Sequence, residues 1–389
     1  MNSMIAACAS AMILLTAVMS QAPAPVFRSF DRVRLLEEKS ETSAGVNIGD
    51  LNGDRLLDIV LGKGRHWSLF NRVLLNDGKG GFFATNLGSA PDRTYSAALA
   101  DVDGDGKLDI VVSNDAPDRK LVYRNDGKGR FTEFGTFGDP KWSTRYVRLA
   151  DLNRDGFADI IAANRGDERV VAPSFVCLND RSGHFPACDA LPTESATTIV
   201  AADFDDDGKV DLFVPHRDGH QSLMLWGDGK GRFPTATKVG AERAWIRIGA
   251  AADLDSDQRP DLVFIEERLG GVFVMFNRGG RQFSDPLPLP GPKRAPYALA
   301  VADLNRDGRP DIVVGWVEKP GSVYYNLGNG REYHEFVWND RQGCRLRYRL
   351  RRLRPGRLAG HRGGAVGCAE CHLVQHEVEV TRLSRSSAR

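Results

Sequence analysis

The sequence predicts an all-β protein, a β-propeller of four-stranded blades. A nine-residue pattern rich in aspartate recurs six times, at steps of 50 to 52 residues. Short apolar runs lie on both sides of each copy, and no segment shows a convincing helical periodicity. A repeat of about 50 residues that contains four short strands is typical of a propeller blade. We therefore expect six blades in frame.

Residues 1–25 carry no charged side chain and contain an apolar run at residues 4–19. The run is too short to span a bilayer comfortably and resembles the hydrophobic region of a secretory signal peptide, although no Lys or Arg precedes it. We predict a signal peptide over residues 1–25 and a mature chain that is secreted or periplasmic, where disulfides persist. We expect no membrane span in the rest of the chain.

Residues 26–45 contain no copy of the pattern. Residues 26–30 look like the fourth strand of a blade, but they arrive before any blade has begun. Propellers commonly close by pairing an N-terminal strand with the last blade, which leaves no open sheet edge. We assign residues 26–45 this closing role.

Residues 46–338 are expected to form the propeller. In the second unit an apolar strand at residues 97–100 leads into the pattern, and a second strand leaves it at residues 110–112. A third strand follows at residues 121–123, and Phe131 opens the fourth. Between them lies Asn-Asp-Gly, a hairpin signal because Asn and Gly accept positive φ angles. The other units repeat this plan.

Each copy of the pattern has oxygen-bearing side chains at positions 1, 3, 5 and 9, and glycine follows position 5 in four of the six copies. A hard cation such as Ca²⁺ takes oxygen ligands, and glycine permits the sharp bend that turns alternate residues inward. An EF-hand would need a Glu at position 12 and flanking helices. The alternative for any single copy is a solvated turn rich in Asp and Asn, but turns do not require four oxygens at the same offsets in six copies.

The predicted metal ligands are the residues at these four positions in the six copies: Asp50, Asn52, Asp54 and Asp58; Asp101, Asp103, Asp105 and Asp109; Asp151, Asn153, Asp155 and Asp159; Asp203, Asp205, Asp207 and Asp211; Asp253, Asp255, Asp257 and Asp261; and Asp303, Asn305, Asp307 and Asp311. Arg55 and Gln258 replace the glycine in the first and fifth copies. We expect these two loops to be the weaker sites, because glycine makes the bend at the lowest cost.

The pattern D-x-[DN]-x-D-G-x-x-D, together with N-D-G-x-G-x-F, resembles the FG-GAP/VCBS repeat family, whose relatives include the integrin α-subunit propeller. The resemblance covers about residues 27–338. It implies calcium held by side chains at positions 1, 3, 5 and 9 and by a backbone carbonyl at position 7. It implies no particular ligand and no reaction.

Charge is unevenly distributed along the chain. Residues 341–389 contain 12 Arg, no Lys, 3 Glu and no Asp, which is a formal charge of +9. The whole chain carries +1, so the remainder carries +1 less +9, or −8. An acidic body suits cations and not nucleic acid. We expect a monomer that binds no nucleic acid.

The sequence contains no nucleophile elbow, no HExxH motif and no phosphate-binding glycine loop. The propeller face opposite the metal loops is built by the connections before the first strand and after the second strand of each blade. Aromatic and charged residues occur there, namely Tyr95, Tyr146, Trp245, Tyr297, His66-Trp67, His216-Arg217-Asp218, Glu266-Glu267-Arg268 and Trp316. They form either a recognition surface or ordinary packing between blades.

Two classes of function remain. The first, which we favour, is a calcium-stabilised scaffold that binds a glycan or an extracellular protein through this face and is not an enzyme. The alternative is an extracellular enzyme that acts on an acidic polysaccharide, since the repeats also resemble propellers with lyase or dehydratase activity. Fold alone does not decide between them.

Cys177 and Cys188 are predicted to form a disulfide. They lie on the third and fourth strands of one blade, roughly equidistant from the turn at residues 179–183. Facing residues of antiparallel strands lie close enough for a bridge. The alternative is two unpaired thiols, because a shift of one residue in register would turn the side chains apart.

Residues 339–389 depart from the repeat: Arg crowds out the other charges and Asp never occurs after residue 340. Codons compatible with residues 351–361, read one base later, encode Gly-Asp-Phe-Asp-Arg-Asp-Gly-Trp-Pro-Asp-Ile, a complete copy of the pattern. Its first Asp falls at codon 352, 49 codons after Asp303, so the period is kept. We predict that a frameshift has removed a seventh blade and that the Arg-rich tail is disordered.

The nucleotide sequence tests this prediction. Restoring one base near codons 339–341 should yield Asp-Phe-Asp-Arg-Asp-Gly in frame with the six blades. A corrected reading frame without that peptide would contradict the frameshift.

Overall fold

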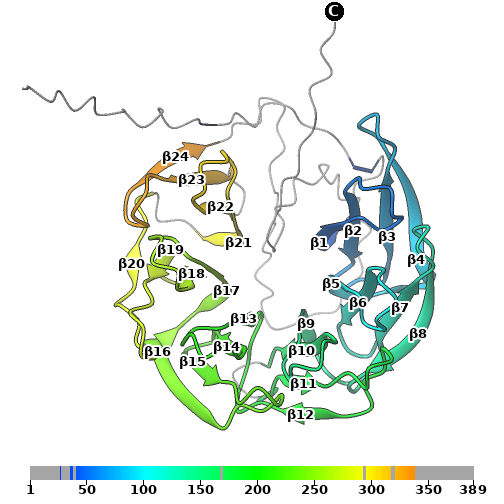
Figure 1. Cartoon of the computed structure of the whole chain (residues 1–389), viewed down its shortest axis with the longest axis horizontal. Coiled ribbons are helices and arrows are strands. Elements are labelled where there is room, and N and C mark those ends of the chain that lie inside the picture. The colour runs from blue at the N-terminus through cyan, green and yellow to red at the C-terminus, as the bar shows by residue number, and fades with distance from the viewer. Residues whose placement is uncertain are drawn as a thin grey trace, which may run out of the picture.

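A computed structural model of the chain describes residue 27 and residues 36–37, 41–166, 170–291, 295–316 and 320–337. Within these residues all regular structure is β, and 24 strands form six four-stranded sheets. Figure 1 shows that the six sheets follow one another in chain order around a ring, with a wider gap between the sixth sheet and the first than between the others. The prediction of six propeller blades is confirmed, while the predicted seventh blade and Arg-rich tail lie outside the described residues.

Each sheet is formed by four consecutive strands, listed here sheet by sheet: β1 Ser43–Gly49, β2 Asp58–Lys63, β3 Leu69–Asn76, β4 Phe82–Asp92; β5 Thr94–Ala100, β6 Asp109–Asn114, β7 Lys120–Asn125, β8 Phe131–Phe137; β9 Thr144–Ala150, β10 Asp159–Asn164, β11 Phe175–Cys177, β12 Cys188–Ala190; β13 Val200–Ala202, β14 Asp211–Val214, β15 His220–Trp226, β16 Thr235–Ala244; β17 Ile246–Ala252, β18 Asp261–Glu266, β19 Gly271–Met275, β20 Leu287–Pro288; and β21 Pro296–Ala302, β22 Asp311–Trp316, β23 Ser322–Asn326, β24 Tyr333–Val337.

The first strand of each sheet lies toward the centre of the ring and the fourth lies at its outer edge (Figure 1). Neighbouring strands within a sheet are antiparallel, as short hairpin connections require. The inner strands contact one another in series, from β1 through β5, β9, β13 and β17 to β21. No helix long and apolar enough to cross a membrane occurs in the part of the chain that the structure describes.

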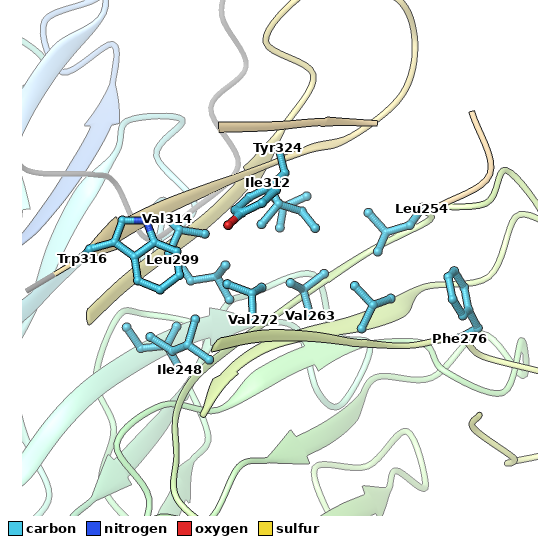
Figure 2. Packing of buried hydrophobic residues seen from close by; sticks show 13 residues of the cluster. Ile248, Leu254, Val263, Val272, Phe276, Leu299, Ile312, Val314, Trp316 and Tyr324 are labelled. Atoms are coloured by element: carbon cyan, nitrogen blue, oxygen red, sulfur yellow. The ribbon is translucent and has the colours of Figure 1, made fainter. Parts of the chain in front are cut away.

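The hydrophobic core lies between neighbouring sheets. Figure 2 shows the cluster between the fifth and sixth sheets, where Val263 and Val272 face Leu299 and Ile312. Similar clusters fill the other four spaces between consecutive sheets. The second strand of each sheet from β6 onward is buried along its whole length. Both faces of the second strand are covered. Its sequence is therefore a continuous apolar run and does not alternate between apolar and polar residues.

The outer hairpin of the third sheet is closed by a disulfide. Cys177 on β11 and Cys188 on β12 are register partners, their Cα atoms lie 4.0 Å apart, and their sulfur atoms are bonded. The predicted disulfide is confirmed. It links two strands of only three residues each, which have few ladder hydrogen bonds of their own.

The N-terminal segment reaches the sixth sheet at one described residue. The ring of Phe27 stacks on His334 of β24 with 4.1 Å between centroids, and it lies 5.2 Å from the ring of Tyr325 on β23. Most of the predicted closing strand, residues 26–45, lies outside the described residues, and β1 already begins at Ser43. Strand pairing by this segment stays a prediction. The predicted signal peptide, residues 1–25, also lies outside the described residues.

In the second, third, fifth and sixth sheets a hairpin asparagine joins the sheet to the one before it. Asn125 Nδ2 donates to the carbonyl oxygen of Leu108 in its own sheet at 2.8 Å and to that of Leu51 in the preceding metal loop at 2.9 Å. The same bond to position 2 of the preceding loop is made by Asn179, Asn277 and Asn326. In the fourth sheet Gly227 replaces the asparagine, and the backbone N–H of Gly231 donates to Leu152 instead. We call the contact between two consecutive sheets a seam. The asparagines of the hairpins therefore stabilise the seams in addition to forming the turns.

Substitution of Asn277 by Ala should weaken the seam between the fourth and fifth sheets. The side chain is 1% exposed, and its loss leaves the buried carbonyl of Phe204 without its donor. We expect the free energy of unfolding to fall by about 2–4 kcal/mol, measured by urea denaturation. Lys230→Ala, in the exposed hairpin before β16, is the control and should unfold like the parent. Equal midpoints for both variants would show that the seam bond is not stabilising.

Candidate functional site

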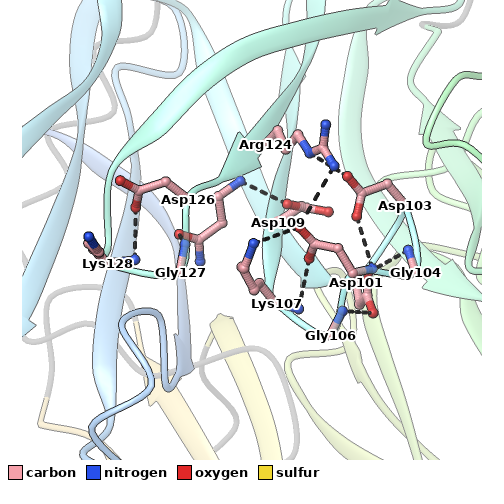
Figure 3. A network of polar contacts seen from close by, with 12 residues as sticks. Asp101, Asp103, Gly104, Gly106, Lys107, Asp109, Arg124, Asp126, Gly127 and Lys128 are labelled. Carbon is pink, nitrogen blue, oxygen red and sulfur yellow. Dashed lines mark hydrogen bonds and ion pairs between the residues drawn. The ribbon is translucent and has the colours of Figure 1, made fainter.

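Each metal loop joins the first and second strands of a sheet and is curled by its first aspartate. In the second copy Asp101 accepts hydrogen bonds from the backbone N–H groups of Gly104 at 2.7 Å and of Gly106 at 2.8 Å (Figure 3). Asp105 N–H also donates to it, at 3.1 Å. These bonds curl the loop around the carboxylate of Asp101.

Two positions of the loop have left-handed backbone conformation in all six copies. The residue after position 5 has φ between 68° and 89°, including Arg55 at 68° and Gln258 at 69°, so loss of the glycine does not change the loop shape. A non-glycine residue there costs about 1–2 kcal/mol. Position 4, which the sequence analysis missed, is also left-handed in every copy: Gly53, Gly104, Arg154, Asp206, Ser256 and Arg306. The only signal for it was glycine in the first two copies.

The aspartate at position 9 is at most 1% exposed in all six copies. Asp109 accepts the backbone N–H of Val102, at position 2 of the loop, at 3.1 Å, and that of the hairpin residue Asn125 at 2.9 Å. Burial raises the pKa of Asp109 to about 6 against the lowering effect of these two hydrogen bonds, and the nearby Asp103 and Asp105 raise it further. The equivalent pKa for Asp261 is raised to about 7 by the same causes. Position 9 therefore ties the metal loop to the third and fourth strands.

Three copies bring the carboxylates of positions 1, 3 and 9 within 4.8 Å of one another: Asp101, Asp103 and Asp109; Asp203, Asp205 and Asp211; and Asp253, Asp255 and Asp261. In the last two copies one oxygen at position 3, Asp205 Oδ1 or Asp255 Oδ1, is buried without a hydrogen-bond donor among the described residues. A buried carboxylate oxygen without a donor is costly, and it is the ligand that a hard cation prefers. These groups fit a divalent cation such as Ca²⁺, and the fifth copy fits as well as the second and fourth.

Position 5 lies apart from these three-carboxylate groups. Asp105 accepts the backbone N–H of Lys107 at 3.0 Å and forms an ion pair with its ammonium at 2.9 Å, and Asp207 and Lys209 repeat this arrangement. Asp103 Oδ2 likewise pairs with Arg124 Nε, 2.5 Å away. In the copies with Asn at position 3, its amide donates to the position 5 carboxylate. The assignment of all 24 predicted ligands stays a prediction, and the geometry supports positions 1, 3 and 9 best.

A second group of side chains lies at the other end of the inner strands. In four copies the residue six positions before the first loop aspartate is the second residue of the inner strand, so it lies about 20 Å from the loop along the strand. This position holds Tyr95 on β5, Arg145 on β9, Arg247 on β17 and Tyr297 on β21. All four inner strands border the centre of the ring (Figure 1). With Arg65, which follows β2, we call these residues the arginine–aromatic cluster.

Contacts within the cluster connect sheets that are distant in the chain. The guanidinium carbon of Arg145 lies 4.1 Å from the ring centroid of Tyr95, and that of Arg247 lies 4.5 Å from the centroid of Tyr297. Arg65 lies 5.5 Å from the Tyr95 centroid and 5.7 Å from the Tyr297 centroid. Contacts of this kind contribute about 0.5–2 kcal/mol each, more where water is excluded. The first, second and sixth sheets therefore meet at this cluster.

Hydrogen-bonding and acidic groups border the cluster on the second sheet's side. Tyr95 Oη lies 2.9 Å from His66 Nε2, and His66 Nδ1 lies 3.5 Å from Asp115 Oδ2. Asp115 also accepts the hydroxyl of Ser143 at 2.7 Å and pairs with Arg145 at 2.8 Å. Burial, followed by Arg145 and Arg65, lowers the pKa of His66, while burial raises the pKa of Tyr95. A neutral imidazole and a protonated phenol thus lie side by side at neutral pH.

A further acid lies beside Arg247. Glu267 accepts hydrogen bonds from Arg217 at 2.7 Å and from Arg247. Burial, then the neighbouring Arg247, lowers the pKa of Arg217 to about 10 against the attraction of Glu267. Arg145, Arg217 and Arg247 therefore share two carboxylates, Asp115 and Glu267.

The aromatic residues predicted for this face are of two kinds, buried in the core or exposed. Tyr146 and Trp316 are 6% and 1% exposed and belong to the core between sheets, so the packing alternative holds for them. Tyr95 and Tyr297 are only partly buried, and Trp67 is 59% exposed. Sequence reasoning missed Arg65, Arg145, Arg247 and Asp115. For Arg145 and Arg247 the signal was their fixed offset from the first loop aspartate.

Comparison with known proteins identifies the repeat. A family model described as an FG-GAP-like repeat matches residues 50–112, 101–162, 203–264 and 253–314. Cartilage acidic protein 1 of Mus musculus is 29% identical over 262 residues, which cover 63% of this chain and 38% of that protein. Integrin alpha-7 of Homo sapiens is 38% identical over 108 residues, which cover 24% of this chain and 9% of that protein. The chain thus matches less than two fifths of the length of each of these relatives.

Solved structures with a similar fold include a lectin. The lectin comes from Agrocybe aegerita and is described as recognising non-reducing terminal N-acetylglucosamine. The TM-score is 0.54 at 22% identity, over 76% of this chain and 80% of the lectin. At this identity the likeness concerns the fold alone.

Proposed function

Because the chain belongs to the FG-GAP-like repeat family, we propose that it is an extracellular, calcium-stabilised propeller that binds a glycan or a protein through the arginine–aromatic cluster. The observation that carries the proposal is the convergence of Tyr95, Arg145, Arg247 and Tyr297 at one register position beside the centre of the ring. Tyr and Arg are the residues most enriched at binding hot spots.

Two features support an extracellular setting. The disulfide between Cys177 and Cys188 persists in an oxidising compartment. The relatives include integrin alpha chains and cartilage acidic protein 1, and the lectin with the same fold recognises a sugar. These proteins' own ligands are not transferred to this chain.

Calcium is proposed as the cation because the candidate groups offer only oxygen. Calcium would supply positive charge among the carboxylates of positions 1, 3 and 9, whose mutual repulsion otherwise opposes the curled loop. Position 9 would transmit this stabilisation to the hairpin, since it also binds the hairpin backbone.

Chelation should lower the melting temperature, and added calcium should restore it. A ligand that binds only the folded state contributes about 2.7 kcal/mol per site at 100 times its Kd. Magnesium should restore little, because it requires a smaller, octahedral site. Asp205→Asn should reduce the calcium-dependent part of the melting temperature, whereas Asp228→Asn, in the hairpin of the same sheet, should not. A melting curve unaffected by chelation would contradict the role of calcium.

The binding proposal is tested with the full chain, calcium-loaded, on an array of glycans and a panel of extracellular proteins. We expect at least one ligand whose binding is weakened tenfold or more by Tyr95→Ala or Tyr297→Ala. Phe83→Ala, at an exposed position on the outer strand β4, should bind like the parent. Binding that survives both tyrosine variants would exclude the cluster as the binding surface.

The contact between His66 and Tyr95 favours a second candidate, β-elimination in an acidic polysaccharide. Arg145 and Arg65 would pair with the uronate carboxylate, and neutral His66 would take the proton from the adjacent ring carbon. The electron pair forms the C4–C5 double bond and expels the C4 oxygen, which takes the proton of Tyr95. Ultraviolet absorbance of the unsaturated product measures turnover, and His66→Ala should abolish it while binding persists. Binding without any absorbance change would leave the scaffold function alone.

A further inference from the structure

The charge at the arginine–aromatic cluster is opposite to that of the rest of the propeller. Residues 1–340 carry a formal charge of −8, and the metal loops concentrate carboxylates at one end of the inner strands. At the other end Arg65, Arg145, Arg217 and Arg247 lie beside the centre of the ring with two carboxylates, Asp115 and Glu267, so the arginines outnumber the acids that pair with them. Although the net charge of residues 1–340 is negative, a local positive region therefore lies about 20 Å from the metal loops.

Arg145 retains a donor that the described residues do not use. Its Nε is buried and has no hydrogen-bond acceptor among the described residues. A buried donor without an acceptor costs about 1–3 kcal/mol. The side chain of Arg145 as a whole is 13% exposed, whereas its Nε and Nη1 atoms are buried. A planar guanidinium binds carboxylate and sulfate groups through paired hydrogen bonds.

Tyrosine rings and hydroxyls accompany this charge on both sides of the centre. Arg145 lies with Tyr95 on the second and third sheets, and Arg247 lies with Tyr297 on the fifth and sixth. Each pair offers one cation beside one amphipathic ring. An extended chain of sugars with an acidic group on separate units matches two such pairs, because rings contact sugar faces while guanidinium groups bind the acids.

We propose, resting on the proposed binding function, that the ligand of the arginine–aromatic cluster is an acidic glycan, a sugar chain that bears carboxylate or sulfate groups. The cluster selects it by pairing those groups with Arg145 and Arg247. A nucleic acid is disfavoured because a large polyanion is repelled by the acidic body, whereas a single sugar chain at the centre contacts mainly the cluster.

Isothermal titration of the full chain, with calcium in excess, uses three probes of equal length: an oligouronate hexamer, a sulfated hexasaccharide and a neutral hexaose. We expect the acidic probes to bind and to weaken as salt rises, and the neutral hexaose to bind at least tenfold more weakly. Arg145→Gln and Arg247→Gln should each weaken binding tenfold or more. Arg145→Lys should recover only part of it, because the charge remains but the paired donors are lost.

Controls separate the ways in which the proposal can fail. Arg130→Gln, whose side chain is 80% exposed in the hairpin before β8, should bind like the parent. Unchanged oligouronate binding by the Arg145→Gln, Arg247→Gln double variant would place binding at the calcium loops and overturn the proposal.

The class of ligand that binds separates this inference from the proposed function. Equal or tighter binding of the neutral hexaose would overturn the acidic ligand class but keep the scaffold function. Binding of a protein but of no glycan would overturn this inference alone. Binding of neither class would overturn both. Melting temperatures of the variants show that each is folded.

Discussion

The buried aspartate at the end of each metal loop is the constraint on which the rest of the structure depends. Asp109 holds the backbone N–H of Val102 in the loop and that of Asn125 in the hairpin, and the side chain of the same asparagine binds Leu51 in the preceding sheet. One chain of hydrogen bonds thus runs from loop to hairpin to neighbouring sheet. Because these groups are buried, none of them can exchange its partner for water without loss of stability.

Much of the fold could be predicted because a repeat imposes one geometry on many sequences. The period and the oxygen offsets predicted four-stranded blades, and Phe131 does open the fourth strand of the second sheet. Cys177 and Cys188 could be paired from their symmetric distance to a turn. The roles of the hairpin asparagines could not be predicted, because their partners lie about 72–77 residues away in another sheet.

The candidate binding surface was harder to predict than the fold, because a shift of one residue in register decides which way a strand side chain points. Tyr95 lies six positions before its loop aspartate and borders the ring centre, whereas Tyr146 lies five positions before its own and packs between sheets. Side chains alternate along a strand, so the two tyrosines belong to opposite faces. Likewise, Arg154 and Ser256 give no sign in their side chains that the loop needs a positive φ.

The seam between the third and fourth sheets differs from the others in the ring. A Cβ atom at Gly227 would lie 2.1 Å from the carbonyl oxygen of Val210, so no asparagine fits there, and a backbone bond from Gly231 replaces the side-chain latch. Apart from the junction between the sixth sheet and the first, this is the seam that lacks a buried asparagine latch, so under a stretching force we expect it to yield before the other four. Tyr95 and Arg145 then belong to one arc, and Arg247 and Tyr297 to the other. Tension would then change the spacing between these two pairs while each pair stays intact.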